Sequence, residues 1–221
     1  MENRVFELVT DSFFKILIPG ITVTVPLTVL SFALALIIAC SMALAQFFDI
    51  KIFKQAARIY IWIIRGTPLL VQLFIVFYGL PKVGLLIDPF PAAVLVFSVN
   101  EGAYCAETIR AALESVPKGQ MEAGLCLGMN RMQTVRKVIF PQALRTAFPT
   151  LANSLIAMVK DTSLAANITV TEMFMAAQRI VARTYEPLIL YIEVGFIYLM
   201  FCTVLTEVQS LGEKRLGEKM I

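Results

Sequence analysis

Long apolar stretches dominate this sequence, and short polar segments separate them. A helix needs about 20 apolar residues to cross a bilayer core, and five stretches are long enough. The predicted spans are about Ile16–Ala45, Ile59–Leu80, Ala92–Leu113, Ala143–Ala166 and Leu188–Val208. The pattern therefore predicts an all-α polytopic membrane protein that forms a single domain over residues 1–221.

Prolines interrupt the first two spans. Pro26 is expected to bend the first span. In the second, Gly66-Thr67-Pro68 is expected to break the helix, because Pro68 has no N–H to donate to the Ile64 carbonyl. Backbone groups freed at membrane depth are tolerated only against protein or a wet cavity. The break is thus predicted to lie beside one or the other.

Three shorter polar segments are predicted to lie outside the membrane. Phe47–Arg58 and Pro81–Pro91 are interpreted as loops. Thr169–Glu186 is too polar to span and is predicted to be an amphipathic helix at the interface, with Thr169 and Glu172 as its capping box. Its apolar stripe consists of Met173, Phe174, Ala177, Ile180 and Val181.

The longest polar interruption, Lys118–Pro141, is typical of a short helix-turn-helix. A first helix is predicted over Gln120–Leu127, and Gly128 supplies the left-handed residue that commonly ends a helix. Asn130 is predicted to cap a second helix, with Gln133 completing a capping box. Pro141 is expected to stop that second helix.

Several polar side chains fall inside the predicted spans, where an ionisable group is costly unless it is paired or wet. The set comprises Thr67, Asn100, Glu101, Tyr104, Glu107, Lys160, Asp161, Thr162 and Ser163. In one cavity, their carboxylates would suit an ammonium group, and their lysine and hydroxyls a carboxylate, so the set is predicted to form a substrate pathway for a zwitterion. Glu107 and Asp161 are its leading members.

The alternative is that these charges neutralise each other where helices pack. Glu107 with Arg110, or Lys160 with Asp161, would form such pairs. Glu193 is interpreted as an interfacial charge near the outer end of the last span.

Composition narrows the function further. The chain is 58% hydrophobic, as is typical of a membrane protein, and its net charge is +3. It has no basic face interleaved with aromatic residues that would indicate binding of nucleic acid. It contains no histidine, which excludes histidine-based acid–base catalysis, Ser-His triads and most kinds of zinc site. No G-x-x-x-x-G-K-[ST] phosphate loop is present, so the chain is not expected to hydrolyse ATP.

The distribution of lysine and arginine predicts the orientation, because such residues are enriched in cytoplasmic loops. One side holds Lys51, Lys54, Arg58, Arg110, Lys118, Arg131, Arg136, Lys137, Arg145, Lys214, Arg215 and Lys219. The other holds Arg4, Lys15, Lys82, Arg179 and Arg183. The N-terminus is therefore predicted to lie outside and the C-terminus in the cytoplasm.

The segment from Glu122 to Pro141 resembles the EAA loop of ATP-binding-cassette importer permeases. That pattern is Glu-Ala-Ala, three residues, Gly, nine residues, Ile-x-Leu-Pro. Glu122, Ala123, Gly128 and Pro141 match it, while Gly124 replaces the second alanine, Val138 the isoleucine and Phe140 the leucine. Further resemblance is carried by Arg65-Gly66-Thr67-Pro68-Leu69, Ala103-Tyr104, Ala106-Glu107, Pro141-Gln142-Ala143 and Lys160-Asp161-Thr162-Ser163-Leu164. Together these are similar to the polar amino acid branch of that family, and to cystine permeases in particular.

The resemblance implies a type I importer fold and a set of partners. The helix around Glu122 would dock on a cytoplasmic ATPase, with Glu122 and Arg131 or Arg136 making charged contacts at the rim. Two ATP-binding subunits would bind the ATP and magnesium, while this chain would need no cofactor. A second permease copy or a paralogue, and an extracytoplasmic amino-acid-binding protein, would complete the importer in the inner membrane of a bacterial cell.

Two other functions stay open at this point. An ion-coupled secondary carrier would use Glu101, Glu107 and Asp161 as ion sites, although five spans without an internal repeat argue against it. A membrane enzyme or an assembly scaffold is the third reading, and the scattered cysteines and missing histidines leave it little catalytic apparatus.

Overall fold

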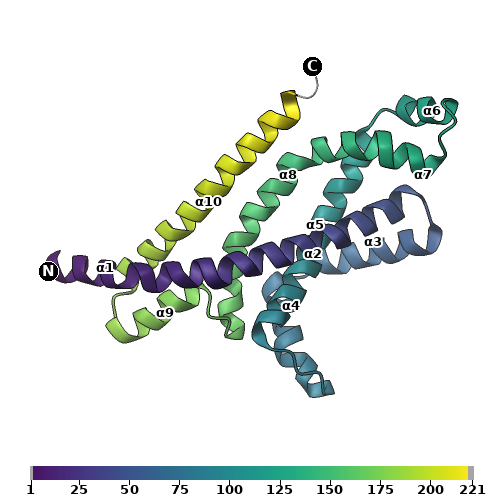
Figure 1. Ribbon diagram of the computed structural model, residues 1–221. Helices are drawn as coiled ribbons and strands as arrows, with labels where there is room; N and C mark the ends of the chain where they lie inside the picture. The colour runs from purple at the N-terminus through teal and green to yellow at the C-terminus, as the bar shows by residue number, and fades with distance from the viewer. Residues whose placement is uncertain (1, 219–221) are drawn as a thin grey trace. The chain divides into compact units, whose positions relative to one another are not determined.

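The computed structural model describes the backbone of residues 2–218 and the side chains of residues 6–216. Arg4 and Lys219, which entered the orientation argument, lie outside the residues whose side chains are described. The described chain is all-helical, as predicted (Figure 1). Its α-helices are α1 (Glu2–Pro19), α2 (Val25–Phe47), α3 (Lys51–Arg65), α4 (Leu69–Phe74), α5 (Pro89–Ser115), α6 (Lys118–Cys126), α7 (Arg131–Thr134), α8 (Phe140–Asp161), α9 (Met173–Thr184) and α10 (Pro187–Glu218).

Short helical turns of other types link several of these helices. Wider π turns cover Gly20–Thr24, Ile75–Gly79 and Val135–Ile139. Tighter 3₁₀ turns cover Leu80–Val83 and Thr162–Ile168.

The first predicted span is confirmed, and it is longer than expected. Phe6–Phe47 forms one helix of 42 residues, so Pro26 does not end it. The π turn at Gly20–Thr24 lies just before this proline, and the Val25 N–H reaches back to the Gly20 carbonyl. A local π turn is a common way for a helix to absorb such an irregularity.

The second span is broken where the sequence predicts. Helix α3 ends at Arg65 and α4 begins at Leu69, with Pro68 in an extended conformation between them. The predicted loop Phe47–Arg58 is wrong, because α3 already begins at Lys51. Ala57 and Ile61, four residues apart, are buried on α3, so packing of this face extends the helix through a segment whose charges had indicated a loop.

Only some of the helices are both long and apolar enough to cross a membrane. Phe6–Phe47 and Pro187–Leu216 are long and apolar enough to cross a membrane, and Lys51–Arg65 with Leu69–Val83 form a third, broken span. Helices α5 and α8 have 27 and 22 residues, which is long enough, but polar side chains lower their mean hydropathy and they are not among these candidate spans. Polar side chains at such depth are typical of helices that face other helices or a wet cavity.

The described residues form two compact units. The first, called the α9 unit, comprises residues 2–33, 68–98 and 155–208. The second, called the hairpin unit, comprises residues 34–67, 99–154 and 209–218.

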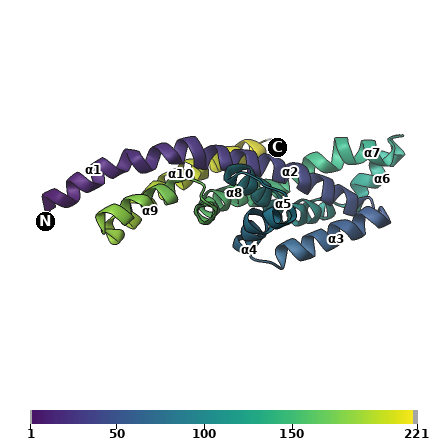
Figure 2. The same ribbon diagram turned by 90° about the horizontal axis from the view of Figure 1, so that it is seen from below.

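Helix α9 packs against α1 in the α9 unit, as both views of the ribbon show (Figures 1 and 2). Met173 and Ala177 are fully buried in a cluster with Ile16 of α1 and Ile197 of α10. The apolar stripe predicted for this segment thus packs on protein.

Two predictions for the α9 unit are wrong. Thr169 is not the N-cap of α9, since it adopts a left-handed conformation (φ 66°) that ends the preceding 3₁₀ turn. Glu172 caps the helix instead, and its side chain accepts hydrogen bonds from the backbone N–H groups of Phe174 and Met175. Glu193 is not an interfacial charge, because it is 6% exposed and accepts a 2.6 Å hydrogen bond from the Ser12 hydroxyl.

Candidate functional site

The helix-turn-helix predicted for Lys118–Pro141 is present as a hairpin of α6 and α7 in the hairpin unit. Gly128 has φ 79°, the left-handed conformation expected of it. Asn130 caps α7: its side chain accepts a 2.9 Å hydrogen bond from the Gln133 N–H, and the Gln133 side chain accepts one of 2.9 Å from the Asn130 N–H. The predicted turn and capping box are therefore both confirmed.

A close contact between Gly124 and Thr134 sets the distance between the two helices. A Cβ atom on Gly124 would lie 2.3 Å from the Thr134 Cγ2 and 2.7 Å from its Oγ1, both far inside van der Waals contact. Thr134 is fully buried, and its hydroxyl donates to the Asn130 carbonyl at 3.1 Å. The glycine that departs from the EAA pattern is thus required by the side chain that faces it.

Pro141 does not stop the second helix, contrary to the prediction. The chain continues from α7 through the π turn Val135–Ile139 into α8 without a break. In that π turn the Phe140 N–H bonds to the Val135 carbonyl, which shifts the hydrogen-bond register just before the proline. The Gln142 side chain donates to the Val138 carbonyl at 2.8 Å, so a carbonyl beside the proline is satisfied without a backbone N–H.

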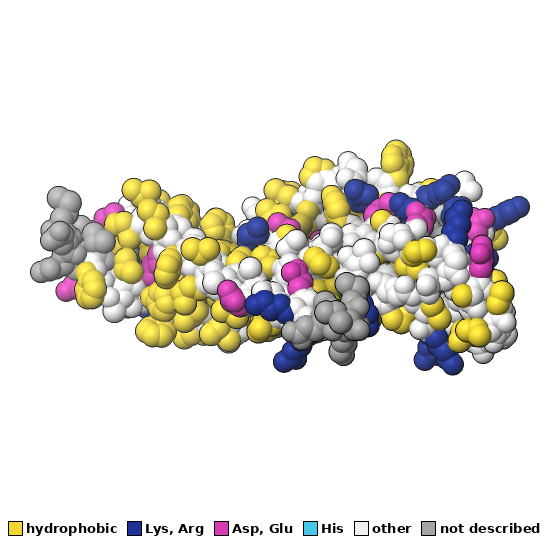
Figure 3. Space-filling view, turned by 90° about the horizontal axis from the view of Figure 1, so that it is seen from above, with side chains coloured by type: hydrophobic (Ala, Val, Ile, Leu, Met, Phe, Trp, Pro, Cys, Tyr) yellow, Lys and Arg dark blue, Asp and Glu magenta, His cyan; other side chains and the backbone are white. Residues whose placement is uncertain are grey.

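Charged side chains cover the outer surface of the hairpin. Glu122, Arg131 and Arg136 are all exposed, as is Ala123. The Arg131 guanidinium lies over the Phe48 ring, 5.7 Å from its centroid. In the space-filling view, dark blue and magenta side chains gather where α6 and α7 lie (Figure 3). This surface is suited to electrostatic docking of another protein.

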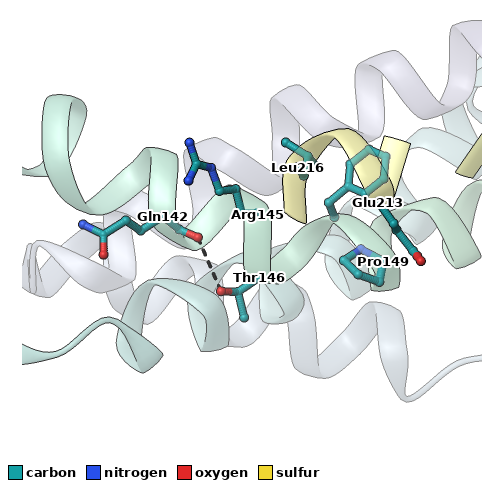
Figure 4. Close-up of a pocket in the computed structure, with 7 residues that line it drawn as sticks. Gln142, Arg145, Thr146, Pro149, Glu213 and Leu216 are labelled. Atoms are coloured by element: carbon teal, nitrogen blue, oxygen red, sulfur yellow. Dashed lines mark hydrogen bonds between the residues drawn. The ribbon is translucent and has the colours of Figure 1, made fainter. Parts of the chain in front are cut away.

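Two cavities open near the hairpin. One of about 460 Å³ is lined by residues of the hairpin and of the adjoining helix ends, among them Phe47, Leu113, Met121, Glu122 and Arg131. The other, of about 590 Å³, lies between the start of α8 and the end of α10 (Figure 4). Figure 4 shows Arg145 and Glu213 on the two helices that border it. Gly212 lies close enough to the Phe148 ring that a Cβ there would approach it to 2.6 Å.

The predicted pathway residues of the second and third spans belong to the hairpin unit. Asn100 is buried and Tyr104 is 41% exposed. Glu101 accepts a hydrogen bond from the Cys105 thiol at 3.4 Å. Thr67, in the break after α3, donates to the Ile63 carbonyl at 3.0 Å.

Glu107 forms an ion pair with Arg110, which was the alternative to a role in the pathway. Arg110 donates to both of its carboxylate oxygens, at 3.1 and 3.0 Å, and also to Glu114 at 2.7 Å. Gln46, Lys54 and Arg58 complete a polar cavity of about 320 Å³ around this network. Glu107 thus lies in a charged cavity, but its carboxylate is already engaged.

The remaining predicted pathway residues belong to the α9 unit. Thr162 is buried and donates to the Val159 carbonyl at 2.6 Å, and Ser163 donates to the Lys160 carbonyl at 2.7 Å. Asp161, the last residue of α8, is partly buried. Lys160 and Ser163 line a cavity of about 300 Å³. Its other walls are Phe174, Tyr191, Val194, Gly195 and Tyr198.

Aromatic rings and a buried carboxylate lie at the cavity of about 300 Å³ that Lys160 and Ser163 line. Phe174 and Tyr191 stack with their centroids 5.9 Å apart. The Tyr198 hydroxyl donates to Glu172 at 3.0 Å, and burial raises the pKa of the Glu172 carboxyl despite its hydrogen bonds. That the two sets of residues face one pathway stays a prediction, since they belong to different units.

Sequence reasoning missed one polar residue of this region. Arg65, the last residue of α3, holds its guanidinium 5.2 Å from the centroid of the Tyr104 ring. A cation at that distance from an aromatic face is attracted by it. Its place inside a predicted span, beside a predicted helix break, was the signal that could have revealed it.

Comparisons with known proteins agree with this geometry. A family model described as the binding-protein-dependent transport system inner membrane component matches residues 35–218. This chain belongs to that family. The matched range includes the whole α6–α7 hairpin and every residue of the predicted pathway.

Two relatives and one solved structure show how far the likeness of this permease extends. The L-cystine transport system permease protein TcyB of Bacillus subtilis (strain 168) is 49% identical over 212 residues, which are 96% of this chain and 91% of that protein. The glutamine transport system permease protein GlnP of Escherichia coli (strain K12) is 39% identical, over 91% of this chain and 93% of that protein. The crystal structure of an amino acid ABC transporter with histidines superposes with a TM-score of 0.84 at 36% identity, covering 93% and 94% of the two chains.

The family settles the general class. The chain is an amino-acid ABC transporter permease subunit, a membrane-embedded transport component with the type I importer fold. The resemblance first detected in the EAA pattern is thereby confirmed.

Proposed function

We propose that this chain is the permease of an ATP-driven importer of L-cystine or a closely related polar amino acid. The observation that carries the proposal is the 49% identity with an L-cystine permease along 96% of the chain. The pathway residues suit a substrate with ammonium and carboxylate groups, as L-cystine has. No chemistry in the permease itself is required, because its role is to provide the path.

The energy would come from two ATP-binding subunits that hold the ATP and magnesium. The exposed face of the α6–α7 hairpin would dock on them, with Glu122 and either Arg131 or Arg136 at the rim. The rigid contact of Gly124 with Thr134 favours transmission of a push from α6 into α7 and on into α8, since the helix continues past Pro141. ATPase closure would then alternate the permease between inward-open and outward-open states.

The remaining partners follow from the same proposal. Five spans are few for an alternating-access path, so a second copy or a paralogue would complete it. With the N-terminus outside and the C-terminus in the cytoplasm, the hairpin would face the ATPases in the inner membrane of a bacterial cell. An extracytoplasmic amino-acid-binding protein would deliver the substrate on the opposite side.

The test is ATPase activity and uptake in proteoliposomes that contain this chain with its co-purified ATPase. Binding protein loaded with L-cystine, L-glutamine or L-histidine is supplied from the outside. We expect stimulation of ATP hydrolysis and uptake to be strongest with L-cystine. Stimulation by another amino acid alone would contradict the substrate, and uptake that persists without ATP but collapses with ionophores would contradict the ATP-driven mechanism.

A further inference from the structure

The cavity of about 300 Å³ in the α9 unit combines polar and aromatic side chains. Lys160 at the end of α8 and Ser163 in the 3₁₀ turn after it are two of its lining residues. Phe174 of α9 and Tyr191 of α10 also line it, and their rings stack with centroids 5.9 Å apart. Two residues of the predicted pathway thus share a cavity with aromatic side chains that sequence reasoning missed.

The hydrogen bonds already present decide what each polar group can offer to a ligand. The Ser163 hydroxyl donates its proton to the Lys160 carbonyl at 2.7 Å, and the Tyr198 hydroxyl donates to Glu172 at 3.0 Å. Toward the cavity, both oxygens can therefore only accept. The Lys160 ammonium forms no hydrogen bond or ion pair with another described side chain: the adjacent Asp161 carboxylate feels its charge but lies beyond ion-pair distance. Its N–H donors are thus available to a ligand.

The depth of the cavity narrows the kind of ligand. Gly195, which lines it, lies seven residues after Leu188, where the last predicted span begins, and this is about 10 Å of helix rise. A cation at such depth is costly unless an anion or water accompanies it. The phosphate of a lipid stays outside the hydrocarbon core. A small solute that enters the permease is therefore the better source of an anion for Lys160.

We propose that this cavity binds the transported amino acid, with its carboxylate on the Lys160 ammonium and its ammonium on the Ser163 and Tyr198 hydroxyl oxygens. A zwitterion needs donors for one group and acceptors for the other, and the cavity offers both. The stacked rings of Phe174 and Tyr191 suit the sulfur atoms of L-cystine, because divalent sulfur makes favourable contacts with aromatic rings. The inference rests on the proposed function and adds the side chains that recognise the substrate.

The experiment measures equilibrium binding of radiolabelled L-cystine to the detergent-solubilised complex of this chain with its ATPase, without the binding protein. Unlabelled L-cystine competes in one series, and cystamine, the analogue without the two carboxyl groups, competes in the other. The variants are Lys160→Gln, Lys160→Arg and Tyr191→Leu. Lys82→Gln is the control, because it removes the same charge from an exposed position of the same unit.

Gly195 provides a further variant that keeps every polar group of the cavity. Nothing beyond its own helix backbone lies within 4 Å of a Cβ atom placed there, so Gly195→Leu should fill the cavity without displacing its neighbours. Thr203→Leu is the matched control, because it adds a leucine at an exposed position of α10 that does not line the cavity.

We expect Lys160→Gln to weaken L-cystine binding at least roughly tenfold and to leave cystamine binding nearly unchanged, so that the preference for L-cystine disappears. Lys160→Arg should keep most of the preference, since it keeps the charge. Gly195→Leu should weaken the binding of both compounds at least tenfold, and Tyr191→Leu should lose several-fold. The two controls should bind as the unsubstituted complex does.

Three results would overturn the inference. Unchanged L-cystine binding in Lys160→Gln or in Gly195→Leu would show that the substrate does not occupy this cavity. An equal loss for L-cystine and cystamine in Lys160→Gln would assign the lysine to the fold alone. An unsubstituted complex that takes up L-cystine in proteoliposomes but does not bind it in detergent would overturn the inference alone, whereas one that takes up none would overturn the proposed function with it.

Discussion

Two capped helices, α7 and α9, carry the same predicted signal and differ in how the structure uses it. In α7 the pair Asn130 and Gln133 caps the helix as predicted. In α9 the pair Thr169 and Glu172 does not, because Glu172 itself becomes the N-cap. Both segments have an oxygen-bearing side chain followed three residues later by Glu or Gln, so the pattern alone does not separate them.

Burial is what separates them. Asn130 and Gln133 are exposed, so local hydrogen bonds decide the start of α7. Glu172 is fully buried, and its carboxylate is shared between two backbone N–H groups and the Tyr198 hydroxyl of α10. A buried carboxylate needs such partners, and tertiary contacts thus shift the helix start by three residues.

The largest effect is expected from Glu172→Ala. This change removes the acceptor of two N–H groups and of the half-buried Tyr198 hydroxyl, which should lower the free energy of unfolding by about 3 kcal/mol. Glu172→Gln keeps one carbonyl acceptor and should lose about half as much. Thermal unfolding of the purified chain in detergent measures both. Equal stability of Glu172→Ala and the unsubstituted protein would show that the cap is not what fixes α9.

The second effect tests the packing of the hairpin. Gly124→Ala places a methyl group 2.3 Å from the Thr134 Cγ2 and should cost about 2 kcal/mol through overpacking. The hairpin would open, so stimulated ATP hydrolysis should fall with it.

A double-mutant cycle tests whether the loss in Gly124→Ala comes from its contact with Thr134. Thr134→Ala removes the two closest atoms, so Gly124→Ala with Thr134→Ala should recover most of the lost ATP hydrolysis. Additive losses in the double variant would contradict the role of this contact.

Features decided by neighbouring residues in the chain could be predicted, and features decided by distant ones could not. The helix break at Pro68, the left-handed Gly128 and the Asn130 cap all follow from local backbone chemistry. The need for glycine at position 124 depends on Thr134, and the position of Arg65 depends on Tyr104 from another span. Apolar periodicity indicates which face is buried, but it does not name the partner.

The third effect isolates backbone conformation from packing. Gly128 has φ 79° and open space around its absent Cβ, so Gly128→Ala should cost about 1 kcal/mol from conformation alone. Gly128→Asn should retain most of the stability, since asparagine tolerates the left-handed region. Amide hydrogen exchange across α6 and α7 would report the change.

Gly119 provides the matched control for that measurement. It also has open space around it, but it lies within α6 at a negative φ. Gly119→Ala should therefore slow exchange slightly, because alanine favours helix over glycine. If both substitutions changed exchange in the same direction, the conformational explanation for Gly128 would be wrong.

The smallest effect returns to the two predicted caps. Asn130→Ala removes an acceptor at an exposed helix start and should cost about 0.5–1 kcal/mol. Thr169→Ala, at the equivalent position of the pattern, should be neutral or slightly stabilising, because Thr169 caps nothing and a branched side chain is strained at φ 66°. Hydrogen exchange at the first amides of α7 and α9 measures the pair. A matching loss in Thr169→Ala would mean that this threonine supports α9 in spite of its conformation, and that the sequence pattern outweighs burial at this helix.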